Sequence, residues 1–187
     1  MNKLVKLPLF LGAVGCLCGG VLAAVNYFTE PVIKANEEKK ANAAFYEHFS
    51  NFDKKNTATV SEELATAGVT QKYYAFDSSK TYIGTIYECS VVGYAGKSSP
   101  IKFTVSFANG QPNHYVSLSH AESNVGKVFM DWLAGDVNGN RLGNLEAGKT
   151  TSGSSVTYAA VNSVVTACST DYLAELANTP TYVEGAQ

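Results

Sequence analysis

A long uncharged stretch near the N-terminus limits how this chain can fold. Residues 7–29, between Lys6 and Glu30, carry no charged side chain. As a helix the stretch would be about 34 Å long, which is enough to cross the hydrocarbon core of a bilayer. A helix also satisfies its own backbone hydrogen bonds, which lipid cannot do. The sequence therefore predicts one transmembrane helix over residues 7–28.

The charges that flank this stretch predict its orientation. Lys3 and Lys6 precede it, whereas Glu30 follows it. The positive-inside rule then leaves residues 1–6 in the cytoplasm and the remaining chain on the extracellular or periplasmic side. A cleaved signal peptide, or a lipoprotein signal processed before Cys16, would export the domain as well. The apolar residues that continue to Phe28 favour the membrane helix over both alternatives.

The rest of the chain has the length and charge of one ordinary domain. Roughly 145 residues follow the apolar stretch, enough to bury a core. The net charge of −2, with no long basic run, gives no indication of a nucleic-acid surface, and no nucleic-acid partner is expected. The cysteines at 16, 18, 89 and 168 form no CxxC pair, so no metal site is predicted. Cys89 and Cys168 either pair after export or are two separate small core residues.

Helical spacing returns directly after the membrane stretch. Apolar positions between residues 36 and 52 recur at three to four residues, which predicts an amphipathic juxtamembrane helix. Residues 53–72 are polar and predict a connection with a short helix near residues 61–67. Residues 29–72 are thus expected to form a juxtamembrane helix and a connection.

The pattern changes to strands after residue 73. Residues 73–94 are rich in β-branched and aromatic side chains, and residues 101–107 alternate apolar and polar. Asn109-Gly110 predicts a tight turn, with a returning strand over residues 115–120. Helices are predicted near residues 127–133 and from Ser155 onward. Residues 73–187 are therefore expected to form one α+β domain, an antiparallel sheet with flanking helices.

A hydroxyl-rich stretch lies immediately before the last predicted helix, over residues 150–157. Helix N-termini offer unpaired N–H groups, hydroxyls add donors, and glycine lets the backbone approach an anion. The stretch is therefore suited to bind phosphate. The alternative is a serine-rich N-cap, because Ser and Thr are preferred caps in any helix.

Several short motifs occur in a fixed order along the chain. They are Thr29-Glu30-Pro31 after the membrane stretch, Gly93-Tyr94-Ala95-Gly96, His120 with Glu122 and Ser123, and Ser152-Gly153-Ser154-Ser155-Val156-Thr157 followed by Val161. In this order the chain resembles the FMN-binding domain family, which includes the G subunit of Rnf electron-transport complexes and the C subunit of the sodium-pumping NADH:quinone oxidoreductase.

The resemblance implies FMN as cofactor, carried through a phosphoester on Ser155 and installed by a flavin transferase. It implies that Ser152, Gly153 and Thr157 hold the phosphate, that Ser154 is also a cofactor-binding residue, and that Glu122 and Ser123 border the flavin. The chain departs from the family pattern Ser-Gly-Ala-Thr, because Ser154 replaces alanine and Ser155 replaces threonine. The loop at residues 122–126 also lacks the family's proline and one glycine.

The function that these features imply is electron transfer by a membrane-anchored flavoprotein. Its expected partners are other membrane subunits of an Rnf-like, ion-translocating complex, and no residue is assigned to catalysis or to a metal. The alternative is a flavin-free structural subunit that keeps the fold. A serine hydrolase is less favoured, because no nucleophile-elbow motif occurs and no histidine lies near the serines in sequence.

Overall fold

The computed structural model describes residues 19, 20, 29, 43–136 and 138–185. The chain divides into two compact units, residues 1–43 and residues 44–187, and the second unit holds the sheet and helices described below. The predicted cytoplasmic residues 1–6, nearly all of the predicted span at 7–28 and the first part of the predicted juxtamembrane helix lie outside the described residues. Within the described part of the chain, every helix is too short or too polar to cross a bilayer.

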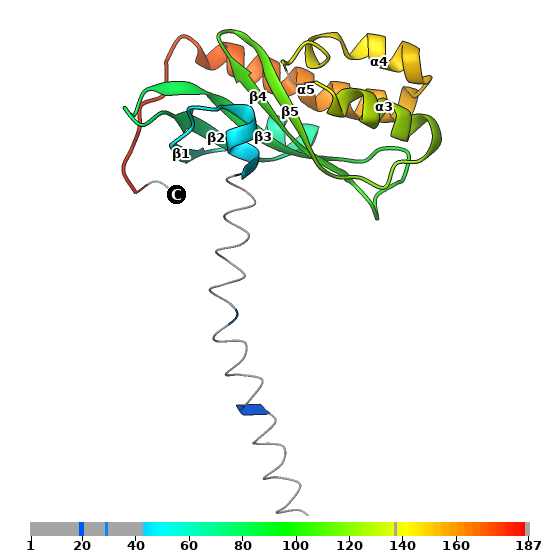
Figure 1. Ribbon diagram of the computed structural model, residues 1–187, viewed down its shortest axis with the longest axis horizontal. Coiled ribbons are helices and arrows are strands. Elements are labelled where there is room, and N and C mark those ends of the chain that lie inside the picture. Colours follow the sequence, from blue (N-terminus) through cyan, green and yellow to red (C-terminus); the bar gives the residue numbers. More distant parts are fainter. Residues whose placement is uncertain (1–18, 21–28, 30–42, 137, 186–187) are drawn as a thin grey trace, which may run out of the picture. The chain divides into compact units, whose positions relative to one another are not determined.

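A five-stranded antiparallel sheet forms the centre of the second unit (Figure 1). Each strand pairs with its neighbour in the sequence, in the order β1-β2-β3-β4-β5. The predicted tight turn is confirmed, because Asn109 and Gly110 have φ angles of 51° and 79° between β4 and β5. The strands are β1 Lys54–Ala58, β2 Val69–Phe76, β3 Tyr82–Val91, β4 Ile101–Ala108 and β5 Gln111–Ser119.

The predicted connection at residues 53–72 contains more structure than the sequence indicated. β1 and the first half of β2 lie there, so the sheet begins before residue 73. β1 is an edge strand with one neighbour, and only Asn56 in it is buried, so it needs no apolar alternation. The short predicted helix is confirmed as α2, Glu62–Ala67, which Ser61 caps by accepting the Leu64 N–H.

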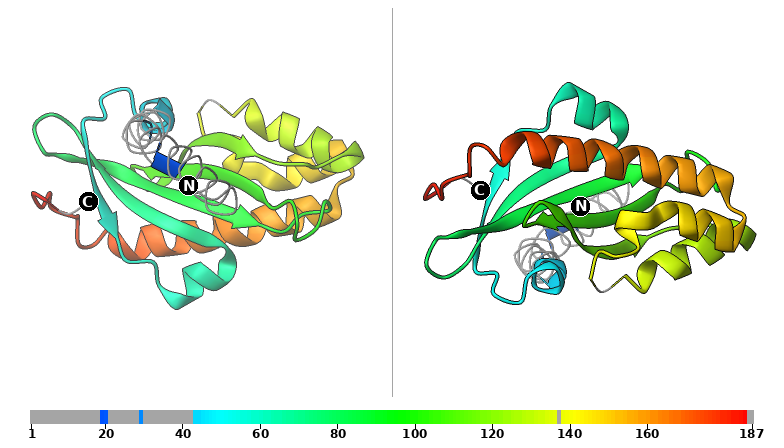
Figure 2. Two further views of the ribbon diagram at one scale, coloured as in Figure 1. Left: turned by 90° about the horizontal axis from the view of Figure 1, so that it is seen from below. Right: turned by 90° about the horizontal axis from the view of Figure 1, so that it is seen from above.

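The remaining helices pack on one face of the sheet. Figure 2 shows α5 running along the sheet, with α3 and α4 beside its N-terminal end. The α5 side chains at 161, 164, 165, 168 and 172 are buried against the sheet, whereas Leu176 follows the helix and is exposed. The elements are α3 Asn124–Ala134, the 3₁₀ turn η1 Leu142–Asn144, α4 Leu145–Ser152 and α5 Ser155–Glu175.

The opposite face of the sheet is covered by residues 44–52. The predicted juxtamembrane helix ends at residue 48 rather than 52, but Phe45, Phe49 and Phe52 all pack on this face. Their partners are Tyr73 and Ala75 on β2 and Ile86 on β3. Both faces are therefore buried, which explains why β3 and β4 are buried along almost their whole length.

His48 fixes the end of this helix to the sheet. Its Nε2 lies 2.7 Å from Thr104 Oγ1, and its Nδ1 lies 3.0 Å from Ser106 Oγ, both on β4. Burial, with a smaller contribution from His114, lowers the pKa of His48 to about 3. The imidazole is therefore neutral at ordinary pH. His48 is therefore a packed residue on a helix face.

Candidate functional site

Glu122 is the centre of a buried polar cluster where three segments of the chain meet. It follows β5, and only 5 % of the residue is exposed. Its Oε1 accepts the Ala95 N–H at 2.9 Å, and its Oε2 accepts the Tyr94 N–H at 3.3 Å. Oε2 also accepts the Thr157 hydroxyl at 2.5 Å. The carboxylate thus ties the turn after β3 and the loop before α3 to the first turn of α5.

Two glycines make room for this carboxylate. A Cβ at Gly93 would lie 2.6 Å from Glu122 Oε1. A Cβ at Gly126 would lie 2.8 Å from Thr157 Oγ1 and closer still to Glu122 Oε2. These distances are too short for a real Cβ, so a larger residue at either position would displace the Glu122 carboxylate from its hydrogen bonds. We call Gly93, Tyr94, Ala95, Glu122, Gly126 and Thr157 together the Glu122 cluster.

The hydroxyl-rich stretch is divided between two helices. Residues 150–152 form the last turn of α4, a helix that the sequence did not predict. Their hydroxyls donate to the carbonyls of residues 146, 147 and 148, at 2.9, 2.8 and 2.8 Å. This local bonding lets hydroxyl residues continue a helix. Gly153 then ends α4 with a φ of 73°, a conformation that favours glycine.

The N-terminus of α5 lacks a side-chain cap. Ser154 is the N-cap residue and is buried, but its side chain makes no cap hydrogen bond. Its N–H donates instead to Ser152 Oγ at 3.1 Å. The first N–H groups of a helix have no partner within the helix, so those of α5 are available to an external acceptor. No described atom would lie within 4 Å of a Cβ on Gly153, which leaves open space beside this helix end.

Ser155 is the first residue of α5 and is exposed. Within the described part of the chain its hydroxyl makes no hydrogen bond, whereas the Thr157 hydroxyl, on the same turn, is committed to Glu122. The structure therefore gives the hydroxyls of Ser155 and Thr157 different roles. That of Ser155 is accessible to a ligand, and that of Thr157 holds the helix in place.

At the N-terminus of α5, the positive charge that would attract an anion comes from the helix dipole. Lys149 on α4 is the nearest basic residue in the sequence, but its Nζ lies 2.8 Å from Glu146 Oε1 and 4.8 Å from the centre of the Tyr158 ring. The hydrogen bond from Lys149 lowers the pKa of Glu146, so this carboxylate stays ionised and neutralises the lysine. The positive end of the α5 dipole then remains as the attraction for an anion.

Exposed apolar side chains flank the Glu122 cluster. Tyr94 belongs to it and is 66 % exposed, Val125 precedes Gly126 and is 49 % exposed, and Val156 precedes Thr157 and is 54 % exposed. Each lies on a different one of the three joined segments. Exposed apolar side chains of this size suit the planar ring of a ligand better than bulk water.

The remaining predicted site residue is Ser123. It is exposed and is the N-cap residue of α3, without a side-chain cap hydrogen bond. Asn124 follows it with a φ of 49°, which asparagine tolerates better than most residues. The donors to Glu122 were not assigned to the site from the sequence, although Gly93-Tyr94-Ala95-Gly96 was one of the recognised motifs. These donors are backbone N–H groups, which every residue except proline has, so the residue types could not indicate which of them bond to Glu122.

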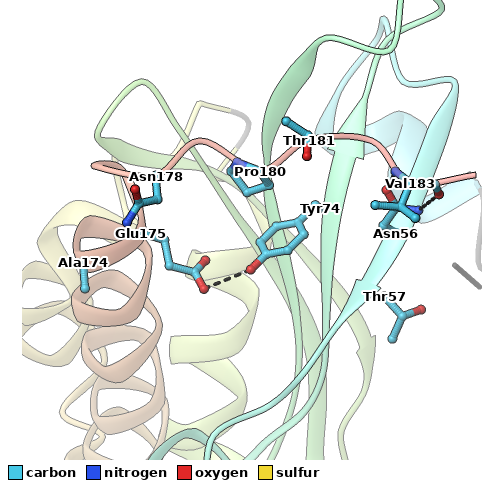
Figure 3. Close-up of a pocket in the computed structure, with 9 residues that line it drawn as sticks. All are labelled: Asn56, Thr57, Tyr74, Ala174, Glu175, Asn178, Pro180, Thr181 and Val183. Carbon is cyan, nitrogen blue, oxygen red and sulfur yellow. Dashed lines mark hydrogen bonds between the residues drawn. The ribbon is translucent and has the colours of Figure 1, made fainter.

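A separate cavity of about 510 Å³ lies at the other end of α5, under the C-terminal segment (Figure 3). Glu175 contributes to its wall and accepts the Tyr74 hydroxyl at 2.9 Å. Glu175 is the last residue of α5 and Ser155 is the first, so the helix separates the two places by roughly 30 Å. The cavity is therefore distinct from the hydroxyl-rich site.

Part of the chain matches a family of known proteins. Residues 2–47 match the family model described as the RnfG N-terminal region, which covers about a quarter of the chain. No curated protein and no solved structure matches the chain. The match lies outside the Glu122 cluster, so it is independent of the motifs there. It supports the resemblance of this chain to RnfG-like FMN-binding proteins.

Proposed function

We propose that the protein is a membrane-anchored flavoprotein electron carrier of an Rnf-type complex, with FMN joined to Ser155 through its phosphate. One observation carries the proposal. The exposed hydroxyl of Ser155 lies at an uncapped helix N-terminus beside open space. A phosphate there would accept the free N–H groups of α5 and would meet the positive end of its dipole.

The neighbouring residues fit this assignment in two different ways. Gly153 lets the backbone approach an anion, and Ser152 orients the N-cap residue Ser154 through its N–H. Thr157 and Glu122 bond to each other, so we assign them to positioning α5 rather than to direct phosphate contact. Ser123 is exposed beside Glu122 and is available to the flavin edge.

The flavin would supply the redox chemistry, and the chain would supply its position. Tyr94, Val125 and Val156 are exposed on the three segments that Glu122 joins, and they would cover part of an apolar ring. Because the cluster fixes these segments to one another, such a surface would keep its shape without a ligand. A preformed surface lowers the cost of ordering the site on binding.

The anchor and the partners follow from the N-terminal part of the sequence. The match at residues 2–47 and the uncharged stretch at 7–29 both support a transmembrane helix within a multisubunit membrane complex. The flanking charges favour a cytoplasmic N-terminus and a domain on the outer side. A flavin transferase is the further partner that maturation requires.

Covalent flavin on Ser155 can be tested by fluorescence after denaturation. The full chain and its Ser155→Ala variant are produced together with the flavin transferase, separated on a denaturing gel and viewed for flavin fluorescence. We expect loss of fluorescence in Ser155→Ala with an unchanged circular dichroism spectrum, because Ser155 is exposed and bonds to no described group. Thr151→Ala is the control, since Thr151 is also exposed in this stretch and should keep the flavin. Equal fluorescence in parent and Ser155→Ala would disprove the attachment site.

A second variant separates the flavoprotein from the flavin-free structural subunit. Ser155→Thr restores the threonine of the family motif at an exposed position. If the transferase labels both Ser155→Thr and the parent, the parent is a flavoprotein. If it labels Ser155→Thr alone, the natural serine is not a substrate and the structural role is supported.

A further inference from the structure

Cys89 and Cys168 lie together in the core although 79 positions separate them in the sequence. Cys89 is on β3 and is 2 % exposed, and Cys168 is on α5 and is 0 % exposed. Both belong to the hydrophobic core between the sheet and α5. These are the two cysteines in the described part of the chain, and both are free thiols in the structure.

The contacts around them bring β3 and α5 together near the two cysteines. Tyr87 on β3 donates its hydroxyl to Asp171 Oδ2 on α5 at 2.8 Å, which fixes the two elements against each other. Cys89 is two residues from Tyr87, on the same face of the strand. Cys168 is three residues from Asp171, about one helical turn away. The Cys89 thiol lies 4.0 Å from the Tyr87 carbonyl oxygen, and burial, followed by the neighbouring Cys168 thiol, raises the pKa of Cys89.

We propose that Cys89 and Cys168 are a disulfide-forming pair that locks α5 to the centre of the sheet when the domain folds in an oxidising compartment. The co-reactant is a low-molecular-weight disulfide such as oxidised glutathione. The Cys89 thiolate attacks it and forms a mixed disulfide, releasing one glutathione thiol. The Cys168 thiolate then displaces the second glutathione. The protein loses two electrons and two protons, and one oxidised glutathione becomes two reduced molecules.

The bond would form before the core closes. In the folded protein both thiols are buried, and the raised pKa of Cys89 keeps it protonated, so reaction with solvent oxidants is slow. Once formed, the bond would close a loop of roughly 80 residues in the unfolded chain. It would raise Tm on the order of 10 °C, because a long loop loses much entropy on closure.

The test uses the full chain in detergent, with Cys16→Ser and Cys18→Ser to remove the other cysteines. The protein is reversibly unfolded and refolded with either oxidised or reduced glutathione, free thiols are then blocked, and an unreduced digest is analysed by mass spectrometry. We expect a cross-linked peptide pair containing Cys89 and Cys168 only after oxidative refolding, and a higher Tm for that sample. Cys168→Ala should give no cross-link and the same Tm under both conditions.

Two results would overturn the proposal. One is recovery of both thiols, free or each joined to glutathione, after oxidative refolding to the native circular dichroism spectrum. The other is a Cys89–Cys168 cross-link without a rise in Tm, which would show that the native packing does not accommodate the bond. The main comparison is between oxidised and reduced samples of the same protein, so the test remains valid even if Cys168→Ala folds poorly.

Discussion

The hydrogen bond between Thr157 and Glu122 is expected to stabilise the domain measurably. Thr157→Val removes the hydroxyl donor and keeps the size of the side chain. Thr157 is 0 % exposed and Glu122 is 5 % exposed, so water cannot replace the lost donor without a rearrangement. The carboxylate Oε2 would keep only the longer bond from the Tyr94 N–H, at 3.3 Å.

The expected loss follows from the charge of the acceptor and its burial. A hydrogen bond to a charged group contributes about 1.5–3 kcal/mol to stability. For a chain of this size, 1 kcal/mol corresponds to a change in Tm of about 2–4 °C. Thr157→Val should therefore lower Tm by roughly 3–12 °C. Thr170→Val is the matched control on the same helix, because the Thr170 hydroxyl is exposed and donates to the Thr166 carbonyl. The control should change stability by less than about 0.5 kcal/mol.

A double-mutant cycle then tests whether the effect belongs to this pair. Thr157→Val, Glu122→Gln and the double variant are compared with the parent by thermal and urea unfolding, monitored by circular dichroism. We expect the double variant to lose less stability than the sum of the single variants, with an interaction energy of about 1–3 kcal/mol. If the stability losses of the two single variants simply add, or if Thr157→Val is as stable as Thr170→Val, the hydrogen bond between Thr157 and Glu122 does not hold α5 in place.

Two further predictions concern buried charge. Lys72 Nζ lies 2.5 Å from Asp171 and 2.7 Å from Glu175, so Lys72→Met should cost about 3–5 kcal/mol in urea unfolding by leaving the two carboxylates without their cation. Lys80→Met, at an exposed lysine, is the control, and equal losses would contradict the argument. For His48, the folded pKa of about 3 lies below the ordinary value of 6.5, so the unfolded chain binds the extra proton and stability falls as pH drops below about 6.5. The loss from this group should reach about 2 kcal/mol between pH 7 and pH 5, and an unchanged slope in His48→Gln would rule it out as the cause.

The sequence predicted those elements whose patterns are local. β4, the Asn109-Gly110 turn and β5 followed from alternation and turn chemistry, and α5 followed from its buried spacing. α4 was missed because glycine, two threonines and a serine make up half of its eight residues, LEAGKTTS, and these residue types favour caps and turns. Packing outweighs that preference, since Gly148 lies against the Trp132 ring so closely that any side chain there would clash.

The motifs predicted which residues belong to the candidate site, but not the hydrogen bonds among them. The motifs indicated Glu122, Ser155 and the glycines, because acidic, hydroxyl and glycine residues can be read directly from the amino-acid sequence. The structure adds that the Glu122 carboxylate faces inward to backbone donors at Tyr94 and Ala95. These bonds depend on how the turn after β3 lies against the loop before α3. That arrangement comes from tertiary packing, which no local pattern encodes.

The two departures from the family motif fall where packing tolerates them. Ser155 is exposed, so the methyl group that threonine would add there contacts solvent and supports no core. Ser154 is 2 % exposed, yet its hydroxyl adds only one atom to the alanine that it replaces. Thr157 is fully buried and bonded to Glu122, and it keeps the residue type of the motif. The fold therefore places little constraint on the choice between serine and threonine at residue 155. A Ser155→Thr variant should match the parent in Tm to within a degree or two, so that any difference in flavin loading reports on the transferase alone.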